Sequence, residues 1–481
     1  MTKNLHIDTQ AMRAKILDLA IQGKLTDQRA EDGNAQDLLK DIQAEKEKLI
    51  KEQQIKKEKP LPEIEADEIP FEIPKNWMWA RWGTLSISIK YGYNTSAQKD
   101  GKIKMVRISD IQNNQVNWDS VPFCNIPKEE ITQYLLRKND ILFARTGGTV
   151  GKSYLVSEVP ENVVYAGYLI RTRYSEKLSP QYLKYFMESD LYWSQLKKGT
   201  TTTAQPNCNA KSLGKMVLPL PPLAEQKRIA DKVATLFAQL DAIDKAYEEY
   251  RELQQTMKAK LLDLAVQGKL TDQREEDGNA RDLLKEIQAE KEKLIKEKQI
   301  KKEKPLPEIT EEEKTFDIPE NWMWVRLGEM ILNHIGGGTP DKSNEAYWNG
   351  DIPWMSVKDV HQDSMYADRT IDSITPAGLE NSSSNLIEAN RLIVVMRMAV
   401  GRAVINKLPV AINQDLRALF FRDNVTQEYI LRIFKILKFE TSGMTVKGIK
   451  LWVLLNTPIP LPPLAEQKRI VAKLDELLPL L

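Results

Sequence analysis

The longest periodic pattern in the chain lies between residues 223 and 267, where no proline or glycine occurs. Within it, apolar residues recur at steps of three and four, the spacing of an α-helix with one apolar, coiled-coil-like face. Such a helix would be about 65 Å long, and Gly268 stands where a helix end favours glycine. The apolar face, which needs a packing partner, comprises Ile229, Val233, Leu236, Leu240, Ile243, Tyr247, Tyr250, Leu253, Met257, Leu261 and Leu264.

Much of this pattern occurs twice along the chain. Residues 12–83 align with residues 257–328 without a gap, and 56 of the 72 aligned positions are identical. A second block, PLPPLAEQKRI, occurs at residues 219–229 and again at 460–470. These shared blocks alternate with two stretches that have no visible similarity to each other. The alternation predicts a repeated frame that positions two different functional modules.

The repeat is cyclic and is cut open inside the long helix. The C-terminal piece AEQKRIVAKLDELLPLL repeats the first half of the helix, and the N-terminal piece QAMRAKILDLAIQG repeats its last third. We therefore expect the two ends to lie close together and to form a broken second helix, packed antiparallel on residues 223–267. In the alternative arrangement, the C-terminal helix frays and the N-terminal helix packs elsewhere.

A second, charge-dense helix is predicted after each copy of GKLTDQR, at residues 35–58 and 280–303. Its apolar stripe is thin, which indicates a solvated face or, as a second interpretation, a surface for a protein partner. The following KPLPEI, at residues 59–64 and 304–309, predicts an extended linker because proline disfavours helix.

The two divergent stretches, residues 84–218 (the first insert) and 329–459 (the second insert), carry short β-branched runs separated by Gly, Asn and Asp turns. We expect an α/β (α+β) globule for each. The predicted strands are 105–111, 141–147, 153–159, 163–174, 352–357, 391–400 and 418–422, and the predicted helices are 180–198 and 427–439.

These patterns give a five-part organisation. It consists of an N-terminal frame region (1–75), a first module (76–218), a central frame region (219–320), a second module (321–459) and a C-terminal helix (460–481).

Charge is distributed unevenly over this plan. The whole chain has a net charge of +1, but residues 77–215 contain 19 Lys and Arg against 11 Asp and Glu. Residues 322–458 contain 15 against 14. A basic module beside acidic helices is compatible with nucleic-acid binding.

Several other classes of protein are disfavoured by composition. The chain has no apolar tract long enough to span a bilayer, and its N-terminus has no apolar run typical of a signal peptide. Two cysteines, Cys124 and Cys208, fit a reducing cytoplasm. The three histidines have no spacing that indicates a metal site. We therefore expect a cytoplasmic protein without a membrane span or a bound metal.

One stretch resembles an active-site loop. TGGTVGKS at residues 146–153 follows an apolar run and ends in Gly-Lys-Ser, as a phosphate-binding loop does. However, Thr146 stands where that motif needs a small residue, and the matching RMAVGRAV at 397–404 lacks Lys-Ser. Two other interpretations fit better than a nucleotide-binding loop and fit comparably well: a turn that brings Arg145 and Lys152 to a polyanion, and a turn with no ligand. No motif for amino-group methylation or dinucleotide binding occurs either, so no catalytic residue is assigned.

The doubled PLPPLAEQKRI, the repeated GKLTDQR and the entrance IPxNWMW resemble the specificity subunit of Type I restriction–modification enzymes. The resemblance covers nearly the whole chain and extends to GGGTPDKS (336–343) and NQDLRALF (413–420). About 75 frame residues precede the first module here, so the layout is a cyclic permutation of that in many relatives.

The resemblance implies a non-catalytic subunit that binds double-stranded DNA. Each module would be a target-recognition domain reading one half of a bipartite, asymmetric site. The helices would fix the spacer and dock two methyltransferase (modification) subunits. S-adenosylmethionine would be bound by the methyltransferase partner, and ATP and Mg by the restriction subunits, with no cofactor on this chain.

We expect DNA contacts from polar and basic residues in turns of the two inserts. In the first insert these candidates are Lys102, Lys104, Arg107, Ser109, Arg145, Thr146, Lys152, Thr201, Thr202 and Gln205. In the second they are Thr339, Lys342, Ser343, Ser356, Lys358, Arg397, Arg402, Thr445 and Lys447. Two other hypotheses remain at this point: a coiled-coil scaffold joining two protein-binding modules, and an NTP-binding enzyme that uses residues 146–153.

Overall fold

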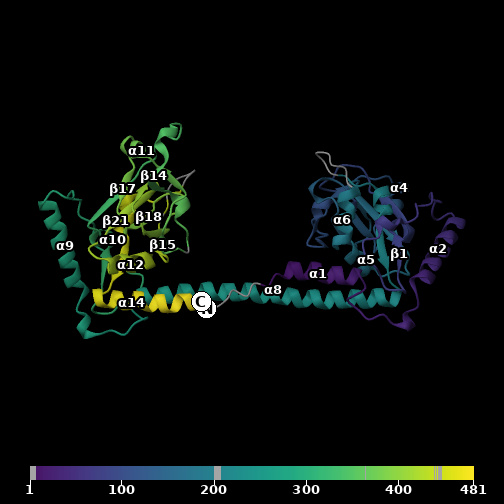
Figure 1. Cartoon of the computed structure of the whole chain (residues 1–481), viewed down its shortest axis with the longest axis horizontal. Helices are drawn as coiled ribbons and strands as arrows, with labels where there is room; N and C mark the ends of the chain where they lie inside the picture. The colour runs from purple at the N-terminus through teal and green to yellow at the C-terminus, as the bar shows by residue number, and fades with distance from the viewer. Residues whose placement is uncertain (1–6, 200–206, 363, 438, 440, 442–446) are drawn as a thin grey trace. The chain divides into compact units, whose positions relative to one another are not determined.

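The structure, a computed structural model, describes residues 7–199, 207–362, 364–437, 439, 441 and 447–481 (Figure 1). The chain divides into two compact units, an N-terminal unit that ends at Glu248 and a C-terminal unit that begins at Glu249. The division falls within the long helix α8 (Leu223–Val266), which contributes its first half to one unit and its last turns to the other. Each unit contains frame segments and one insert.

Helix α8 ends where the sequence predicts. Gly268 adopts a left-handed backbone with φ of +67°, and a Cβ atom there would lie 2.4 Å from Pro319. The amide of Lys269 bonds to the carbonyl of Leu264, which closes the helix end. Gly23 ends helix α1 (Thr9–Ile21) in the same way, with Pro74 as the close neighbour. Both glycines are thus required by conformation and by packing.

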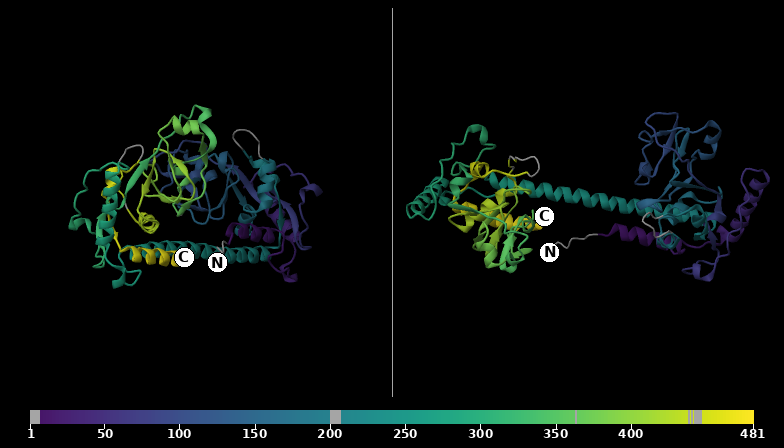
Figure 2. Two further views of the ribbon diagram at one scale, coloured as in Figure 1. Left: turned by 60° about the vertical axis from the view of Figure 1, so that its left-hand side comes forward. Right: turned by 90° about the horizontal axis from the view of Figure 1, so that it is seen from above.

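The terminal helices pack antiparallel on α8, as predicted (Figure 2). In the N-terminal unit, Thr9 donates to Asp244 at 2.7 Å, while Arg13, further along α1, reaches back to Asp241 at 2.8 Å. In the C-terminal unit, α14 (Leu464–Leu477) shares a core with the last turns of α8, and Gln254 bonds to the carbonyl of Leu481. The predicted meeting of the two chain ends falls on residues 1–6, outside the described residues.

The charged helices α2 (Ala35–Lys51) and α9 (Ala280–Lys296) are shorter than predicted. Each ends because the chain turns into the left-handed region at Gln53 or at Lys298, both with φ of 58°. The amides of Gln54 and Gln299 then bond back to the carbonyls of Leu49 and Leu294. Because Gln and Lys seldom adopt this conformation, the sequence gives no signal for the stop.

Each insert leaves and re-enters the frame through a two-stranded antiparallel ribbon. In the N-terminal unit the ribbon pairs β1 (Met78–Arg81) with β11 (Val217–Leu220). In the C-terminal unit it pairs β12 (Met323–Arg326) with β22 (Pro458–Leu461). The repeated NWMW and PLP sequences are therefore partners in space.

A buried glutamate next to this ribbon joins three frame segments that are distant in sequence. Glu225 is fully buried and accepts hydrogen bonds from Trp77 Nε1 at 2.8 Å, Gln28 Nε2 at 2.7 Å and Thr26 Oγ1 at 3.3 Å. Glu466 accepts the same three bonds from Trp322, Gln273 and Thr271. Burial raises the pKa of Glu466, so these donors offset the cost of desolvating the carboxylate. Both copies of PLPPLAEQKRI therefore supply the glutamate for the same buried contacts.

A buried arginine fixes the KPLPEI linker to the ribbon. Arg81 donates to the carbonyls of Pro62, Glu63 and Lys215 at 2.7, 2.6 and 2.7 Å and pairs with Glu68. Arg326 repeats this arrangement in the C-terminal unit, where its hydrogen bonding lowers the pKa of Glu313 to about 2. The predicted extended linker is therefore held by side-chain to main-chain bonds rather than by a sheet.

The first insert contains two principal sheets. One has the strand order β2-β10-β7-β8, and the other has the order β6-β3-β9, in which β3 and β9 are parallel. The strands are β2 (Ser86–Tyr91), β3 (Ile103–Val106), β6 (Phe123–Cys124), β7 (Ile141–Ala144), β8 (Ser153–Leu155), β9 (Val163–Tyr165) and β10 (Leu169–Tyr174).

The second insert shares this arrangement and adds one strand to each sheet, β15 and β17, although its sequence shows no similarity to the first. Its sheets have the orders β13-β21-β18-β19-β15 and β16-β14-β20-β17, and β14 and β20 are again parallel. The strands are β13 (Asn333–Gly336), β14 (Trp348–Met355), β15 (Tyr366–Ala367), β16 (Asp372–Ile374), β17 (Asn385–Ile387), β18 (Leu392–Val395), β19 (Ala403–Asn406), β20 (Val410–Ile412) and β21 (Leu416–Phe420). The α/β prediction for each insert is confirmed.

Several predicted elements differ in extent. The run 163–174 is two strands, because residues 166–168 carry the chain from one sheet to the other. The run 180–198 is two helices, α5 (Pro180–Phe186) and α6 (Asp190–Gly199), because Ser189 bonds to the carbonyl of Phe186 and interrupts the helix. The run 105–111 ends as a strand at Val106 and continues into a 3-10 turn, Ile108–Asp110. Helix α12 spans Asn424–Phe434.

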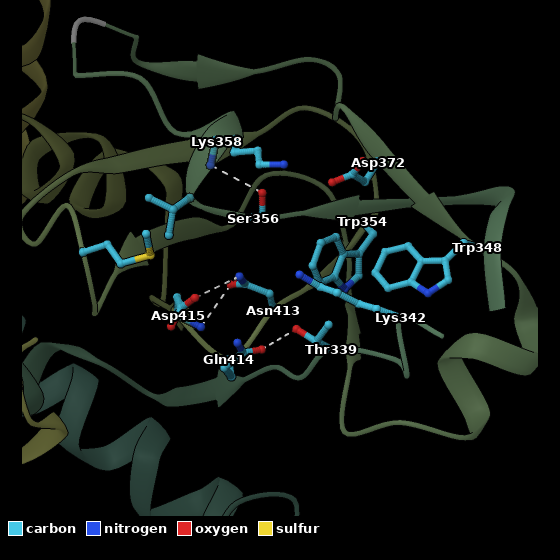
Figure 3. Close-up of a pocket in the computed structure, with 12 residues that line it drawn as sticks. Thr339, Lys342, Trp348, Trp354, Ser356, Lys358, Asp372, Asn413, Gln414 and Asp415 are labelled. Carbon is cyan, nitrogen blue, oxygen red and sulfur yellow. Dashed lines mark hydrogen bonds between the residues drawn. The ribbon is translucent and has the colours of Figure 1, made fainter. Parts of the chain in front are cut away.

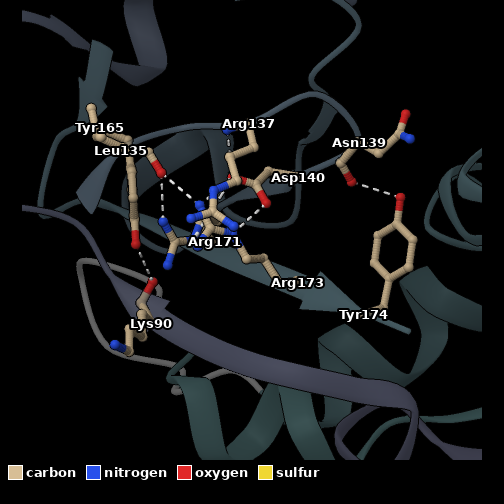
Figure 4. A network of polar contacts seen from close by, with 9 residues as sticks. All are labelled: Lys90, Leu135, Arg137, Asn139, Asp140, Tyr165, Arg171, Arg173 and Tyr174. Atoms are coloured by element: carbon tan, nitrogen blue, oxygen red, sulfur yellow. Dashed lines mark hydrogen bonds and ion pairs between the residues drawn. The ribbon is translucent and has the colours of Figure 1, made fainter. Parts of the chain in front are cut away.

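A buried polar network is specific to the first insert (Figure 4). Arg171 is 1% exposed, donates to the carbonyl of Leu135 at 2.8 Å and lies over the ring of Tyr165 at 5.2 Å. Asp140 pairs with Arg173 at 2.8 Å, and burial raises the pKa of Tyr165 to about 12. The strand register aligns Arg171 with Ala418, so the second insert has an apolar core at this place. At this place, buried polar residues stabilise the first insert and apolar residues stabilise the second, although the fold is the same.

A histidine in the second insert predicts a pH dependence of the C-terminal unit. Arg417 Nη1 lies 2.8 Å from His334 Nδ1, and Glu303 Oε1 lies 2.8 Å from His334 Nε2. The arginine can only donate, so the ring proton sits on Nε2 and the imidazole is neutral. Burial, and then the charge of Arg417, lowers the pKa of His334.

Because the folded state then binds a proton less readily than the unfolded state, stability is retained above the ordinary histidine pKa and lost as pH falls through the folded value. Relative to the intrinsic rate at each pH, hydrogen exchange in β13 and β21 should accelerate as pH falls from about 7 to about 5. The variant H334I, with the residue found at the aligned position 89, should lose this acceleration. Equal acceleration in the variant would contradict the assignment.

Candidate nucleic-acid interface

Both inserts have a pocket at the carboxyl ends of two adjacent parallel strands. In the first insert, the residues after β3 and β9 line it, including Arg107, Ser109 and Tyr168. In the second insert, the residues after β14 and β20 line it, including Ser356, Lys358 and Gln414 (Figure 3). Carboxyl ends of parallel strands gather at one sheet edge, which is a common place for ligand sites.

The strand registers align the two pockets residue by residue. Val106 pairs with Tyr165 in one insert as Met355 pairs with Ile412 in the other, so Arg107 corresponds to Ser356. In both, the amide of that residue bonds at 2.8 Å to an aspartate three positions on, Asp110 or Asp359. The backbone is therefore the same, while the side chains that it presents differ.

Aromatic and amide groups form the second pocket. Trp348 and Trp354 meet edge to face at 5.1 Å, and Trp354 Nε1 donates to Ser384 at 3.1 Å. Gln414 accepts a hydrogen bond from Thr339 and is exposed. Exposed amides and hydroxyls beside apolar rings can form hydrogen bonds to base edges and stack on apolar surface.

The hairpins that join β7 to β8 and β18 to β19 border the two pockets. Thr149 lines the first pocket and Met398 the second. Arg397 pairs with Asp415 at 3.3 Å, and Lys152 aligns with Arg402 at the end of the hairpin. The bases of the hairpins are held by residues of the last insert segment, where Lys447 offers its carbonyl to Met398.

In each insert, many but not all of the predicted contact residues lie at the pocket or in the hairpin that borders it. Arg107, Ser109, Thr339, Lys342, Ser356 and Lys358 line pockets. Arg145, Thr146, Lys152, Arg397 and Arg402 belong to the bordering hairpins, and Arg145 stacks over Tyr91 at 4.7 Å.

Three candidates lie apart from this cluster. The ammonium of Lys104 turns inward and bonds to the carbonyl of Trp118, so it holds the loop instead of facing a ligand. Ser343 donates its hydroxyl to Asp341 at 2.8 Å, and exposed Lys102 lies outside the pocket. Thr201, Thr202, Gln205 and Thr445 lie outside the described residues.

Sequence reasoning did not select several pocket residues. Trp354 falls in the predicted strand 352–357 and Trp348 outside any predicted element, and neither was assigned a role in the site. Asn413 and Gln414 occur in NQDLRALF, which served only as part of the family resemblance. A usable signal was available: Asn-Gln-Asp interrupts two buried strands, and polar residues between such strands are typical of a site.

The nucleotide-binding alternative for residues 146–153 is wrong. These residues form a 3-10 turn (Gly147–Thr149) within an antiparallel hairpin, whereas a phosphate loop leads into a helix. Gly151 has φ of +93°, and its Cβ would lie 2.1 Å from Leu196, so the glycine serves packing. Across the described ranges, no group of His, Cys, Asp and Glu could hold a metal, and no helix could cross a membrane.

Two α/β modules with equal backbones and unequal pockets, carried on one duplicated helical frame, define a two-module recognition protein. A family model described as the Type I restriction modification DNA specificity domain matches residues 89–250 and 319–479, once for each module. The chain therefore belongs to the Type I restriction–modification DNA specificity family.

Known proteins agree with this assignment. The chain is 27% identical over 536 aligned residues to the Type I restriction enzyme EcoEI specificity subunit of Escherichia coli, covering 97% of this chain and 88% of the relative. The EcoAI specificity subunit of the same organism is 27% identical with the same coverage. A solved chain from work on complex assembly and conformational transition of the type I R-M system matches with a TM-score of 0.53, at 23% identity over 85% of this chain and 91% of that chain.

Proposed function

We propose that the chain is the DNA-reading subunit of a Type I restriction–modification complex and is not itself catalytic. Each module acts as a target-recognition domain, the first over residues 76–218 and the second over residues 321–459. Each reads one half of a bipartite site, and because the modules differ, the site is asymmetric.

The observation that carries this proposal is the contrast between frame and pockets. The frame contacts of Glu225 and Glu466 are the same, whereas the aligned pocket residues Arg107 and Ser356 differ in size, charge and reach. A scaffold module would have no reason to keep a pocket in one place and vary its lining. A reader of two different half-sites requires such variation.

The remaining DNA contacts follow from position and charge. The basic residues of the hairpins and turns, such as Lys152, Lys342 and Arg402, are proposed to hold phosphates around each pocket. The net charge of +8 over residues 77–215 favours this for the first module.

The frame is proposed to set the spacer between the half-sites and to dock two methyltransferase subunits. S-adenosylmethionine belongs on those partners, and ATP and Mg on restriction subunits that join the cytoplasmic complex. The exposed charged faces of α2 and α9, which are nearly identical in sequence, are candidate docking surfaces, one for each methyltransferase.

The test uses the full chain assembled with its methyltransferase subunit. Methylated adenines are mapped in cells that carry both, and gel shifts are run with and without the partner. We expect one bipartite, asymmetric motif and sequence-selective binding by the assembled complex. A complex that forms without methylating or selecting any motif would support the scaffold hypothesis instead.

A further inference from the structure

The guanidinium of Arg107 is fixed at the pocket of the first insert. Its Nε and Nη2 atoms donate to the two carboxylate oxygens of Asp110 at 3.1 and 2.7 Å. The Asp110 side chain is 7% exposed and also accepts the Arg107 amide, so it cannot swing away without opening the turn. The ion pair raises the pKa of Arg107 and holds the long side chain in one orientation.

This pairing leaves one edge of the guanidinium for a ligand. Among the described residues, the bonds of Arg107 use Nε and one hydrogen of Nη2, and the side chain is 42% exposed. The opposite edge presents Nη1 and the second Nη2 hydrogen as two parallel donors. Two such donors match the O6 and N7 acceptors of guanine in the major groove, the commonest specific arginine contact.

The second pocket lacks this arginine–aspartate pair, although the backbone of the turn is the same. Ser356 replaces the arginine, and its short hydroxyl bonds to Asp359 at 3.2 Å. The other oxygen of Asp359 accepts the amide of Ile371 at 2.7 Å, so it is not available to orient a guanidinium. The two modules therefore differ at this position in both the reading group and its support.

We propose that Arg107, positioned by Asp110, reads a guanine in the half-site recognised by the first insert. This rests on the proposed function, because it names the base contacted by a residue of the same site. Ser356 has no equivalent contact, so the second half-site carries no guanine requirement from this position.

The decisive variant is R107S, which installs the residue that the second insert already uses at the aligned position and which can still cap the turn. The variant chain is assembled with the methyltransferase subunit, and its methylated motif and duplex affinities are compared with the wild type. Duplexes carry single replacements of each guanine in the first half-site. K128S controls for lost charge, because it also replaces a cationic side chain with serine, at an exposed lysine of the first insert outside the pocket.

We expect R107S to lose about ten- to a hundredfold in affinity for the cognate duplex and to accept other bases at one guanine position. The other half of the motif should stay unchanged, and K128S should keep the full motif. A uniform loss on all duplexes, with a shallower salt dependence and an intact motif, would mean a phosphate contact and would overturn the inference.

R107K provides the second variant, since lysine keeps the charge but not the fork. It should also relax the guanine position, and full retention of the motif by R107K would equally overturn the inference. Failure of the proposed function is distinguishable, because the wild-type complex itself would then select no motif.

Discussion

The N-terminal unit is expected to lose about 2–4 kcal/mol of unfolding free energy when Glu225 is replaced by alanine. The carboxylate is fully buried and accepts three hydrogen bonds, and the variant leaves the Trp77 indole N–H buried without an acceptor. Gln28 is exposed and Thr26 is half-buried, so both can turn toward water, which limits the loss. Because the Glu225 side chain is buried, its removal also leaves a cavity.

The two units are best followed separately, because a chain of two compact units need not unfold in one step. Hydrogen exchange should accelerate in α1, β1 and β11 of E225A, and α14 and β22 should keep their wild-type rates. E466A should give the mirror result in the C-terminal unit. K227A, at an exposed position on the same helical turn, should change stability by less than about 0.5 kcal/mol. Wild-type exchange in E225A would show that the buried carboxylate is dispensable.

The frame could be predicted from the sequence, but the role of this buried glutamate could not. Near-identity of two distant blocks identified the segments that belong together, and the three- and four-residue apolar spacing located the long helix. The reason for the repeated Glu-Gln pair could not be read from the sequence. It depends on Thr26 and Gln28 from one segment and Trp77 from another reaching the carboxylate of a third.

The helix ends and the inserts were harder to predict. The stops of α2 and α9 depend on left-handed Gln53 and Lys298, whose side chains carry no turn signal. The common topology of the inserts is hidden because the cores differ, with Arg171 in one where Ala418 stands in the other. Backbone hydrogen bonds and turns preserve a fold after side-chain similarity has been lost.

Several polar residues of the candidate site could be predicted from the sequence, but its aromatic residues could not. Choosing basic and polar turn residues found Arg107, Lys342 and Lys358, because sites gather in turns at strand ends. The same criterion included Lys104, whose long side chain folds back onto the carbonyl of Trp118. It omitted Trp354, because an aromatic residue in a strand reads as core until the partner strands are known.

The frame contacts suggest that the inserts are interchangeable. Tyr182 of the first insert donates to the carbonyl of Pro219 as Tyr429 of the second donates to that of Pro460. Lys46 donates to the carbonyl of Thr84 at the start of the first insert, and Lys291 donates to that of Ile331 near the start of the second. Each frame copy thus meets its insert through backbone groups and aligned side chains, so an exchanged insert should find its usual partners.

The largest functional change is expected from a chain in which residues 84–218 also replace residues 329–459. The frame of the C-terminal unit can accept this insert, since Gln467 Oε1 is buried there without a partner among the described residues. The first insert would supply the missing donor, because the amide of Ser179 bonds to the equivalent Gln226 at 2.9 Å. The grafted unit should therefore fold.

With two copies of one reader on a two-fold repeated frame, the assembled complex should methylate an inverted repeat of the first half-site. Affinity for the original asymmetric site should fall by at least about a thousandfold, because each mismatched base pair of the lost half costs about 1–3 kcal/mol. The reciprocal chain, with residues 329–459 in both places, should select the inverted repeat of the other half. Adenine-methylation maps of cells expressing each graft with the methyltransferase subunit measure both outcomes. A graft that kept the parental asymmetric motif would show that specificity resides in the frame and not in the inserts.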